Sequence, residues 1–161
     1  MFITEKLAAA LNRQVGHEFA NALQYVALAN WFEAEDLCLA AKFYYTQADE
    51  ERGHAQKITR FLIDSDAEVA IPDLGSVVNR FAGAVEAAQL AYDSEVKTTE
   101  QILVLVALSQ SEGCPTAFLF LQWFVEEQVE EVATARRNLH VLSKAGNNFF
   151  LTETVLFPEN H

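Results

Sequence analysis

The sequence contains few of the residues that mark turn-rich, disulfide-bonded or membrane-spanning proteins. Only six glycines and three prolines occur among its 161 residues, too few for a turn-rich β fold. The two cysteines, Cys38 and Cys114, make neither a disulfide framework nor a C-x-x-C site. The longest apolar run, from Ile102 to Leu108, is too short to cross a bilayer. We therefore expect long helices, with no disulfide framework and no transmembrane segment.

Positive charge is also scarce. The chain has 11 Lys and Arg against 23 Asp and Glu, a net charge of −12. This charge argues against nucleic acid and anionic membranes as partners, because both are bound through phosphates. It is compatible with concentrating cations and equally with solubility alone. The N-terminus has no positive cluster followed by an apolar core, so we expect no signal peptide and a soluble cytoplasmic protein.

The apolar residues, 51% of the chain, are sufficient for a core, and the length suits one domain over residues 1–161. Hydrophobic periodicity and helix-end signals predict five helices. Thr4 is a suitable N-cap for the first helix, Pro115 suits the first turn of the fourth, and Gly146 suits its C-terminal cap. The expected helices cover about residues 4–35, 39–64, 84–111, 116–145 and 148–157, with a crossover over about 65–83.

The lengths of the connections predict how these helices are arranged. Each of the four long helices would be about 40 Å long. Short turns join the first helix to the second and the third to the fourth, so each pair should be antiparallel. The connection between the second and third helices, which holds Pro72 and Gly75, is unusually long for a helical domain. It can travel the whole length of the bundle. We therefore predict an all-α four-helix bundle with one long crossover and a short fifth helix.

Each long helix carries polar residues on its apolar stripe. On the second helix we expect this stripe to run through Phe43 and Gln47. The acids lie about 11 to 15 residues from the helix starts, or about 17 to 22 Å along the axes. Helices running in either direction share a midpoint plane, so four carboxylates should meet in one layer. The inward polar residues are Glu18 on the first helix, Glu51 and His54 on the second, Glu95 on the third, and Gln128 and Glu131 on the fourth.

Four clustered carboxylates inside a core are very unfavourable unless something compensates their charge. They could be protonated, pair with cations or bind metal, but the four stripes carry no Lys or Arg near this layer. Metal binding is the simplest explanation. Glu51 and His54, three residues apart on one helix, can reach the same ion. Oxygen-rich ligation with a single imidazole suits iron or manganese, and zinc could bind adventitiously.

Four segments resemble those of bacterial non-haem ferritins, in order and at matching separations: HEFANALQY, ADEERGHA, YDSE and FLQWFVEEQVEEV. The likeness covers nearly the whole chain. It implies a ferritin-like fold and a ferroxidase that oxidises Fe(II) with dioxygen or hydrogen peroxide and stores the product as ferric mineral. It also implies a closed shell of about 24 copies, entered through acidic pores, with the fifth helix around the four-fold axes.

Carried over residue by residue, the resemblance implies roles for the inward side chains and some of their neighbours. The first iron site would use Glu18, Glu51 and His54. The second would share Glu51 and add Glu95 and Glu131, with Gln128 beside it. A third, looser site maps to Glu50, Glu127 and Glu130, with Glu131 as a possible shared ligand. Tyr25, two helical turns from Glu18, would serve the centre as a hydrogen-bond or electron donor.

Other interpretations remain open for several of these residues. Glu50, Glu127 and Glu130 belong to acidic runs, which are usually solvated faces. Tyr25 could be an ordinary core tyrosine with its hydroxyl satisfied. Trp123 is more readily explained by packing than by an electron relay.

Missing motifs narrow the choice within the family. Met1 is the only methionine, so the paired-methionine haem site of bacterioferritins cannot form and no haem is expected. The fourth helix has no Glu-x-x-His, and the chain has no four-cysteine iron domain of the rubrerythrin kind. Two alternatives remain. One is a non-mineralising di-metal oxidase or peroxidase of monomeric or dimeric state, and the other is a purely structural shell subunit, which the complete ligand set disfavours.

Overall fold

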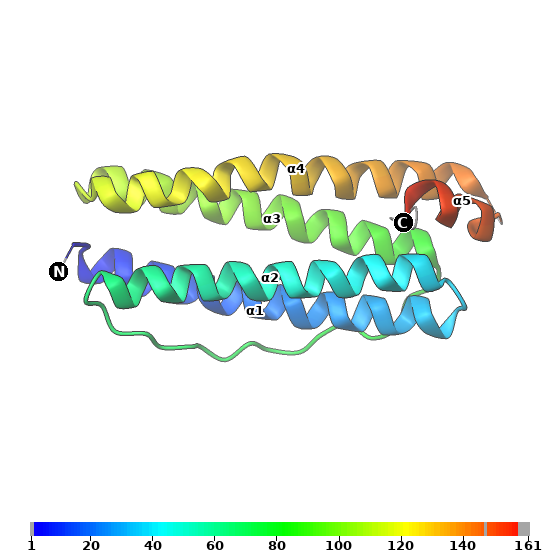
Figure 1. Cartoon of the computed structure of the whole chain (residues 1–161), viewed down its shortest axis with the longest axis horizontal. Coiled ribbons are helices and arrows are strands. Elements are labelled where there is room, and N and C mark those ends of the chain that lie inside the picture. Colours follow the sequence, from blue (N-terminus) through cyan, green and yellow to red (C-terminus); the bar gives the residue numbers. More distant parts are fainter. Residues whose placement is uncertain (1, 147, 158–161) are drawn as a thin grey trace.

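The computed structural model describes residues 2–146 and 148–157 and shows four long helices and one short helix in a single bundle (Figure 1). The described residues contain no strand, so the predicted all-α four-helix bundle is confirmed. Met1, Asn147 and residues 158–161 lie outside the described residues. The helices are α1 (Glu5–Ala34), α2 (Cys38–Asp64), α3 (Ala84–Ser111), α4 (Pro115–Ala145) and α5 (Phe149–Leu156).

The topology follows from one long connection and two short ones. Figure 1 shows α1 antiparallel to α2 and α3 antiparallel to α4, each pair joined by a tight turn. The crossover between α2 and α3 runs beside α1 and α2 along the whole bundle, so α3 begins at the same end as α2. This is the predicted crossover. None of the described helices is long and apolar enough to span a membrane.

The crossover is held against α1 by close packing and by hydrogen bonds. A Cβ added to Gly16 would lie 2.3 Å from Cγ of Pro72, so only glycine leaves room for the proline ring. Further along, the Gln24 side chain pairs with the backbone of Val78: its amide donates to the carbonyl, and its oxygen accepts from the N–H, both at 2.8 Å. These contacts replace the hydrogen bonds that the extended backbone lacks.

The first helix is capped locally and the second from a distance. The Thr4 hydroxyl accepts from the N–H of Leu7 at 3.2 Å, as predicted for an N-cap. Leu37 precedes α2 and has no side chain that could do the same. A carboxylate oxygen of Glu153, on α5, instead accepts from the N–H of Ala40 at 2.8 Å. The short C-terminal helix therefore supplies a hydrogen-bond acceptor to the first turn of α2, and the same hydrogen bond holds α5 against α2.

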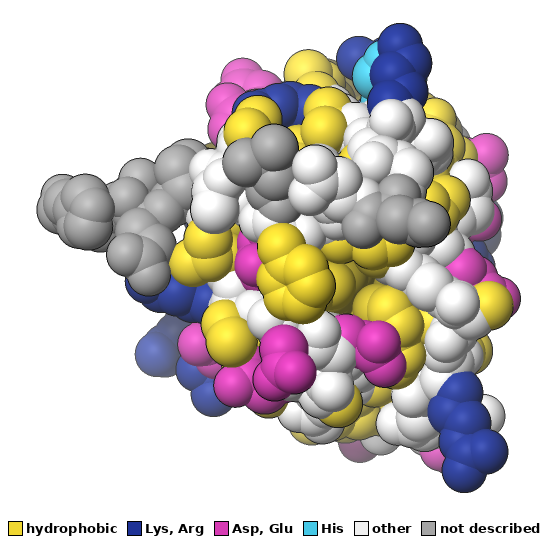
Figure 2. All heavy atoms as spheres, turned by 90° about the vertical axis from the view of Figure 1, so that its right-hand side faces the viewer, with side chains coloured by type: hydrophobic (Ala, Val, Ile, Leu, Met, Phe, Trp, Pro, Cys, Tyr) yellow, Lys and Arg dark blue, Asp and Glu magenta, His cyan; other side chains and the backbone are white. Residues whose placement is uncertain are grey.

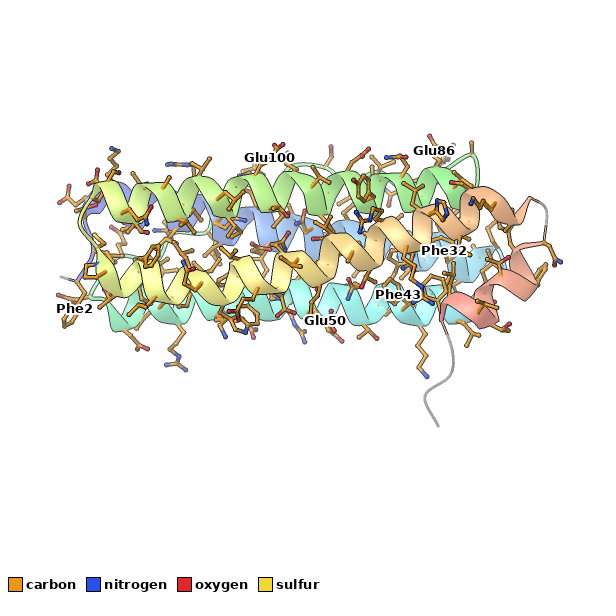
Figure 3. All side chains as sticks on the ribbon, turned by 90° about the horizontal axis from the view of Figure 1, so that it is seen from above. Phe2, Phe32, Phe43, Glu50, Glu86 and Glu100 are labelled. Atoms are coloured by element: carbon orange, nitrogen blue, oxygen red, sulfur yellow. The ribbon has the colours of Figure 1, made fainter. Side chains whose placement is uncertain are left out.

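The hydrophobic core consists of two clusters, one towards each end of the bundle. Figure 3 shows Phe32 and Phe43 near the end that carries α5, and Phe2 at the other end. The cluster at the α5 end includes Tyr25, Phe32, Tyr44, Ala88 and Leu142. The cluster at the opposite end includes Leu11, Val15, Ile58, Ile102 and Phe124. One buried acid of each long helix lies between these two clusters: Glu18, Glu51, Glu95 and Glu131.

The buried stripe of α2 differs by one residue from the expected one. Tyr44 and Ala48 are buried, whereas Phe43 and Gln47 are only half-buried, so the expectation was wrong for those two positions. A residue seven positions before Glu51 lies about 20° from it around the helix axis, and one eight positions before lies about 80° away. Position 44 therefore shares the inward face and position 43 does not.

Candidate metal centre

The structure buries all six polar residues that the helical stripes place inward. Glu18, Glu51 and Glu95 are each only 1% exposed. Each of the four long helices supplies one acid, which lies near the middle of that helix. The acid is buried because it interrupts the apolar stripe that faces the core. The six buried residues are Glu18, Glu51, His54, Glu95, Gln128 and Glu131.

Three of these side chains converge closely. Ligand atoms of Glu18, Glu51 and His54 all lie within 4.8 Å of one another. Nδ1 of His54 is 3.7 Å from Oε2 of Glu51, too far for a hydrogen bond. Such a separation is what two ligands of one ion require, since each metal–ligand bond is about 2 Å long. The Glu-x-x-His spacing on α2 thus produces the geometry that the sequence predicts.

Three of the buried carboxylates each keep one oxygen free. Oε2 of Glu18, of Glu51 and of Glu95 has no hydrogen-bond partner. The second oxygen of two of them is held: Gln14 donates to Oε1 of Glu18 at 2.8 Å, and the Tyr25 hydroxyl donates to Oε1 of Glu95. A buried acceptor without a partner is costly, and three in one layer suit the binding of a cation better than solvent. The donor set, carboxylates and one imidazole, fits iron.

Burial and mutual repulsion raise the pKa of these carboxyls. Burial, and then the neighbouring Glu95, raise the pKa of both Glu51 and Glu131 to about 8. Burial and then Glu51 raise the pKa of Glu18 well above its ordinary value. The pKa of Glu95 is raised by burial and partly restored by the hydrogen bond from Tyr25. A cation entering the layer would reverse the balance and favour the charged forms.

Tyr25 is buried at the edge of the layer, on the side of the α5-end cluster. Its hydroxyl donates to Glu95, and its ring stacks on Tyr44 with centroids 5.9 Å apart. Burial, and then the charge of Glu95, raise the pKa of Tyr25 well above its ordinary value, so the phenol keeps its proton. The hydroxyl can therefore orient Glu95 directly. This contact adds a specific role to what could have been an ordinary core tyrosine.

Two residues that sequence reasoning missed hold the ligands in place. Gln14 lies one helical turn before Glu18 and bonds to it. Thr99 lies one turn after Glu95, and its hydroxyl donates to Oε1 of Gln128 at 2.9 Å. The Gln128 side chain in turn lies close enough to Glu95 to lower the pKa of that carboxyl. Polar residues four positions from a buried acid on the same helix were the available signal, since such pairs are neighbours on the helix surface.

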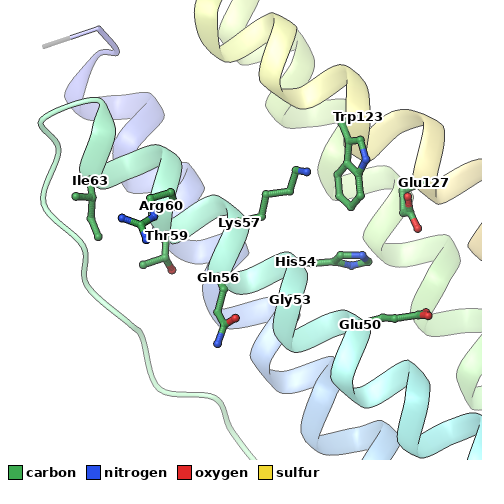
Figure 4. Close-up of a pocket in the computed structure, with 10 residues that line it drawn as sticks. All are labelled: Glu50, Gly53, His54, Gln56, Lys57, Thr59, Arg60, Ile63, Trp123 and Glu127. Carbon is green, nitrogen blue, oxygen red and sulfur yellow. The ribbon is translucent and has the colours of Figure 1, made fainter.

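A second triad lies beside the first and faces a pocket. Ligand atoms of His54, Glu127 and Glu131 lie within 4.8 Å of one another. The pocket, here named the α2–α4 pocket, encloses about 820 Å³, and Figure 4 shows His54, Glu50 and Glu127 projecting into the same region of it. It gives solvent and ions access to the edge of His54. The buried layer is therefore reachable from one side through carboxylates.

One wall of the α2–α4 pocket is formed by a cation and an aromatic ring. Nζ of Lys57 lies 3.7 Å from the centre of the Trp123 ring, which also packs edge-on against His54 at 5.5 Å (Figure 4). These contacts fit the packing role expected for Trp123. They also fix the plane of the imidazole, which lies at 75° to the indole.

The structure does not gather every expected ligand set. Among the described residues, the trio Glu51, Glu95 and Glu131 is not one of the compact triads, although the charge of Glu95 raises the pKa of both Glu51 and Glu131. Glu50 and Glu130 are exposed, and Glu50 accepts a hydrogen bond from Gln47. All three iron sites therefore stay predictions, and within the described part of the chain only the first and the His54 edge of the layer have compact ligand sets.

Comparisons with known proteins match nearly the whole chain to one family. The family model described as Ferritin, a ferritin-like domain, matches residues 8–145. The chain is 41% identical over 154 residues to ferritin BfrB of Mycobacterium tuberculosis, covering 96% of this chain and 85% of that protein. It is 29% identical over 157 residues to the bacterial non-heme ferritin of Staphylococcus epidermidis, covering 96% and 95% of the two chains.

Solved structures give the same result. An open-pore ferritin from the hyperthermophilic archaeon Archaeoglobus fulgidus superposes with a TM-score of 0.94 at 28% identity, and the match covers 99% of both chains. A form of that ferritin engineered to be closed superposes with a TM-score of 0.93, again at 28% identity and over 98% of both chains.

Proposed function

Because the chain belongs to the ferritin family, we propose that it is an iron-storage ferroxidase that oxidises Fe(II) in the buried carboxylate layer and stores Fe(III) in a shell of identical subunits. One observation carries the proposal. Glu18, Glu51 and Glu95 each hold an unpartnered oxygen in the same buried layer, beside His54. Divalent cations bound to these oxygens would stabilise the layer. Fe(II) is the cation that this ligand set and the ferritin family favour.

In this proposal, two Fe(II) ions bind as substrates. Glu18, Glu51 and His54 hold the first. Glu51, Glu95 and Glu131 hold the second, with Gln128 positioned beside Glu95 by Thr99. A third, more accessible ion uses Glu50, Glu127 and Glu130, with Glu131 shared. No haem takes part.

The chemistry needs both ions at once. Each Fe(II) gives one electron, and dioxygen takes two electrons and two protons to become hydrogen peroxide. With hydrogen peroxide as oxidant, the same two electrons and two protons yield two waters. Paired delivery avoids releasing one-electron radicals. The protein's part is to position the ions and balance their charge, and the redox change belongs to the metal.

Tyr25 and Gln14 assist by fixing which carboxylate oxygen faces the substrate. Each donates to one oxygen of its partner, Glu95 or Glu18, and leaves the other for the ion. Holding ligands in advance lowers the reorganisation needed when Fe(II) arrives. Tyr25 could also supply an electron, the role that the family resemblance attaches to it.

Storage requires assembly, which we place at about 24 copies from the family resemblance. The surface of α5 supports contacts between copies, because Phe150 and Val155 are 65% and 60% exposed on a subunit of this kind. Figure 2 shows the end of the molecule that carries α5, where hydrophobic and acidic side chains lie exposed together. The cytoplasm stays the expected compartment.

The test is to load the protein with Fe(II) without oxygen, admit air, and follow iron absorbance and particle size together. We expect rapid oxidation of about two Fe(II) per subunit in a large particle, followed by soluble mineral growth. Glu18→Ala and His54→Ala should slow the rapid phase sharply without changing particle size. Glu100→Ala, which removes an exposed acid of α3, is the matched control.

Two outcomes would change the assignment. An unaltered rapid phase in both Glu18→Ala and His54→Ala would disprove the proposed centre. Rapid oxidation in a small particle that forms no mineral would keep the centre and make the protein a non-mineralising oxidase.

A further inference from the structure

A second hollow lies on another side of the bundle and has a different chemical character. It lies between α3 and α4, encloses about 470 Å³, and is here named the α3–α4 groove. Arg136 is the only charged residue among the described residues that line it. Its apolar walls include Ile102 and Leu103 of α3 and Val125, Val129 and Val132 of α4.

Two residues that line the groove lie beside the buried carboxylate layer. Thr99 and Gln128 line it, and the Thr99 hydroxyl bonds to Oε1 of Gln128 at 2.9 Å. The Thr99 hydroxyl also lies 2.9 Å from the backbone carbonyl oxygen of Glu95, and the buried Gln128 side chain lowers the pKa of the Glu95 carboxyl. One hydrogen-bonded pair therefore separates the groove from a carboxylate of the buried layer.

The two hollows differ in what they can attract. The α2–α4 pocket presents Glu50, Glu127 and His54, which attract Fe(II). The α3–α4 groove offers no carboxylate and carries the guanidinium of Arg136, so it repels a cation. Its apolar lining favours a small uncharged molecule, because removing apolar surface from water is favourable. Apolar hollows in proteins can take up such molecules, xenon among them.

We propose that the α3–α4 groove is the entry site for dioxygen, delivering it across the Thr99–Gln128 pair to Glu95. The inference rests on the proposed ferroxidase function and adds a separate entry route for dioxygen. Fe(II) and dioxygen then reach the layer from different sides and meet only where two electrons can leave together. Hydrogen peroxide, which is polar, uses the α2–α4 pocket instead.

The direct test is to expose crystals of the assembled protein to xenon under pressure. We expect a xenon atom against Val125 and Val129. No xenon in the groove at a pressure that fills other apolar sites would overturn the proposal. This measurement needs no iron, so its result is independent of whether the ferroxidase assignment holds.

The kinetic test fills the groove. Val129→Trp places a large ring at a lining residue that is 69% exposed, and Leu119→Trp places the same ring at an α4 residue that is 70% exposed and does not line the groove. The rate of the rapid phase is measured against dioxygen concentration after anaerobic Fe(II) loading. We expect Val129→Trp to reduce the slope several-fold and Leu119→Trp to leave it unchanged.

Hydrogen peroxide distinguishes blocked access from a damaged centre. With peroxide as oxidant, Val129→Trp should react at the wild-type rate, and equal slowing with both oxidants would overturn the proposal. Leu103→Trp, from the α3 side, repeats the test should Val129→Trp fail to assemble. Wild-type protein that bound no Fe(II) would refute the ferroxidase assignment, whereas normal Fe(II) oxidation with unchanged slopes in both groove variants would refute only the groove.

Discussion

Metal binding should release protons from the buried layer, and the amount should depend steeply on pH. Glu51 and Glu131 have pKa values of about 8, raised first by burial and then by Glu95. In the metal-free protein these carboxyls therefore keep their protons up to nearly that pH. A divalent ion binds the deprotonated form, so its affinity rises with pH up to about 8 and then levels off.

The expected size follows from the two pKa values. At pH 7 each carboxyl is about 90% protonated, so ions that ligate both release about 1.8 protons per subunit from this pair. At pH 9 the same pair releases about 0.2, a difference of about 1.6 protons. Below pH 8, each displaced proton changes the apparent binding free energy by about 1.4 kcal/mol per pH unit. Glu131→Gln should lower the release at pH 7 by about 0.9 protons.

Calorimetry measures this release directly. Fe(II) is titrated anaerobically in two buffers of different protonation heat at pH 7 and at pH 9, and Co(II) serves as a redox-inert second ion. Glu100→Gln, an exposed acid of α3, is the control and should behave as the wild type. Equal release at both pH values, or no effect of Glu131→Gln, would refute the argument that the layer is protonated when empty.

Three further predictions concern the fold. Gly16→Ala should lower the free energy of unfolding by about 1–3 kcal/mol, because the new methyl group collides with Pro72. Gly53→Ala has open space around it and should raise the free energy of unfolding by about 0.5–1 kcal/mol. Melting temperatures that move in the same direction in both variants would contradict this. Glu153→Ala removes the distant cap of α2 and should speed hydrogen exchange of the Ala40 amide about fivefold, whereas Glu153→Gln, which keeps an acceptor, should change it less. The metal-free protein should melt at a lower temperature at pH 9 than at pH 5.5, because carboxyls with a raised pKa bind more protons in the folded than in the unfolded state. The stability that these protons contribute is lost as the pH rises from about 4.5 to about 8. A melting temperature that rises with pH would contradict this.

Most of the architecture could be predicted because its signals are local. Thr4, Pro115 and Gly146 mark helix ends through the hydrogen bonding and backbone angles of neighbouring residues. The inward position of Glu51 and His54 follows from the helical period alone. The α2 stripe was wrong at Phe43 because periodicity fixes the spacing of a stripe and leaves open which of two adjacent stripes faces the core.

The remaining features depend on contacts between helices, which no local pattern contains. Glu153 caps a residue 113 positions earlier, and only the docking of α5 brings the two together. Thr99 reads as an ordinary polar residue of α3 until α4 places Gln128 opposite its hydroxyl. The α3–α4 groove likewise exists only through the way two helices pack.

The position of the carboxylate layer also has a consequence for how the subunit comes apart. The layer separates the α5-end cluster from the opposite cluster, so each end packs its own apolar residues and can open as its own cooperative unit. Without metal, the two ends are connected only by the helix backbones and by a few polar contacts, such as the hydrogen bond from Tyr25 to Glu95. An ion held by several helices at once binds only when both ends are closed, and its binding free energy is added to the closed state of each. With iron bound, the two ends of the subunit should therefore unfold together as one cooperative unit. Without iron they should unfold separately.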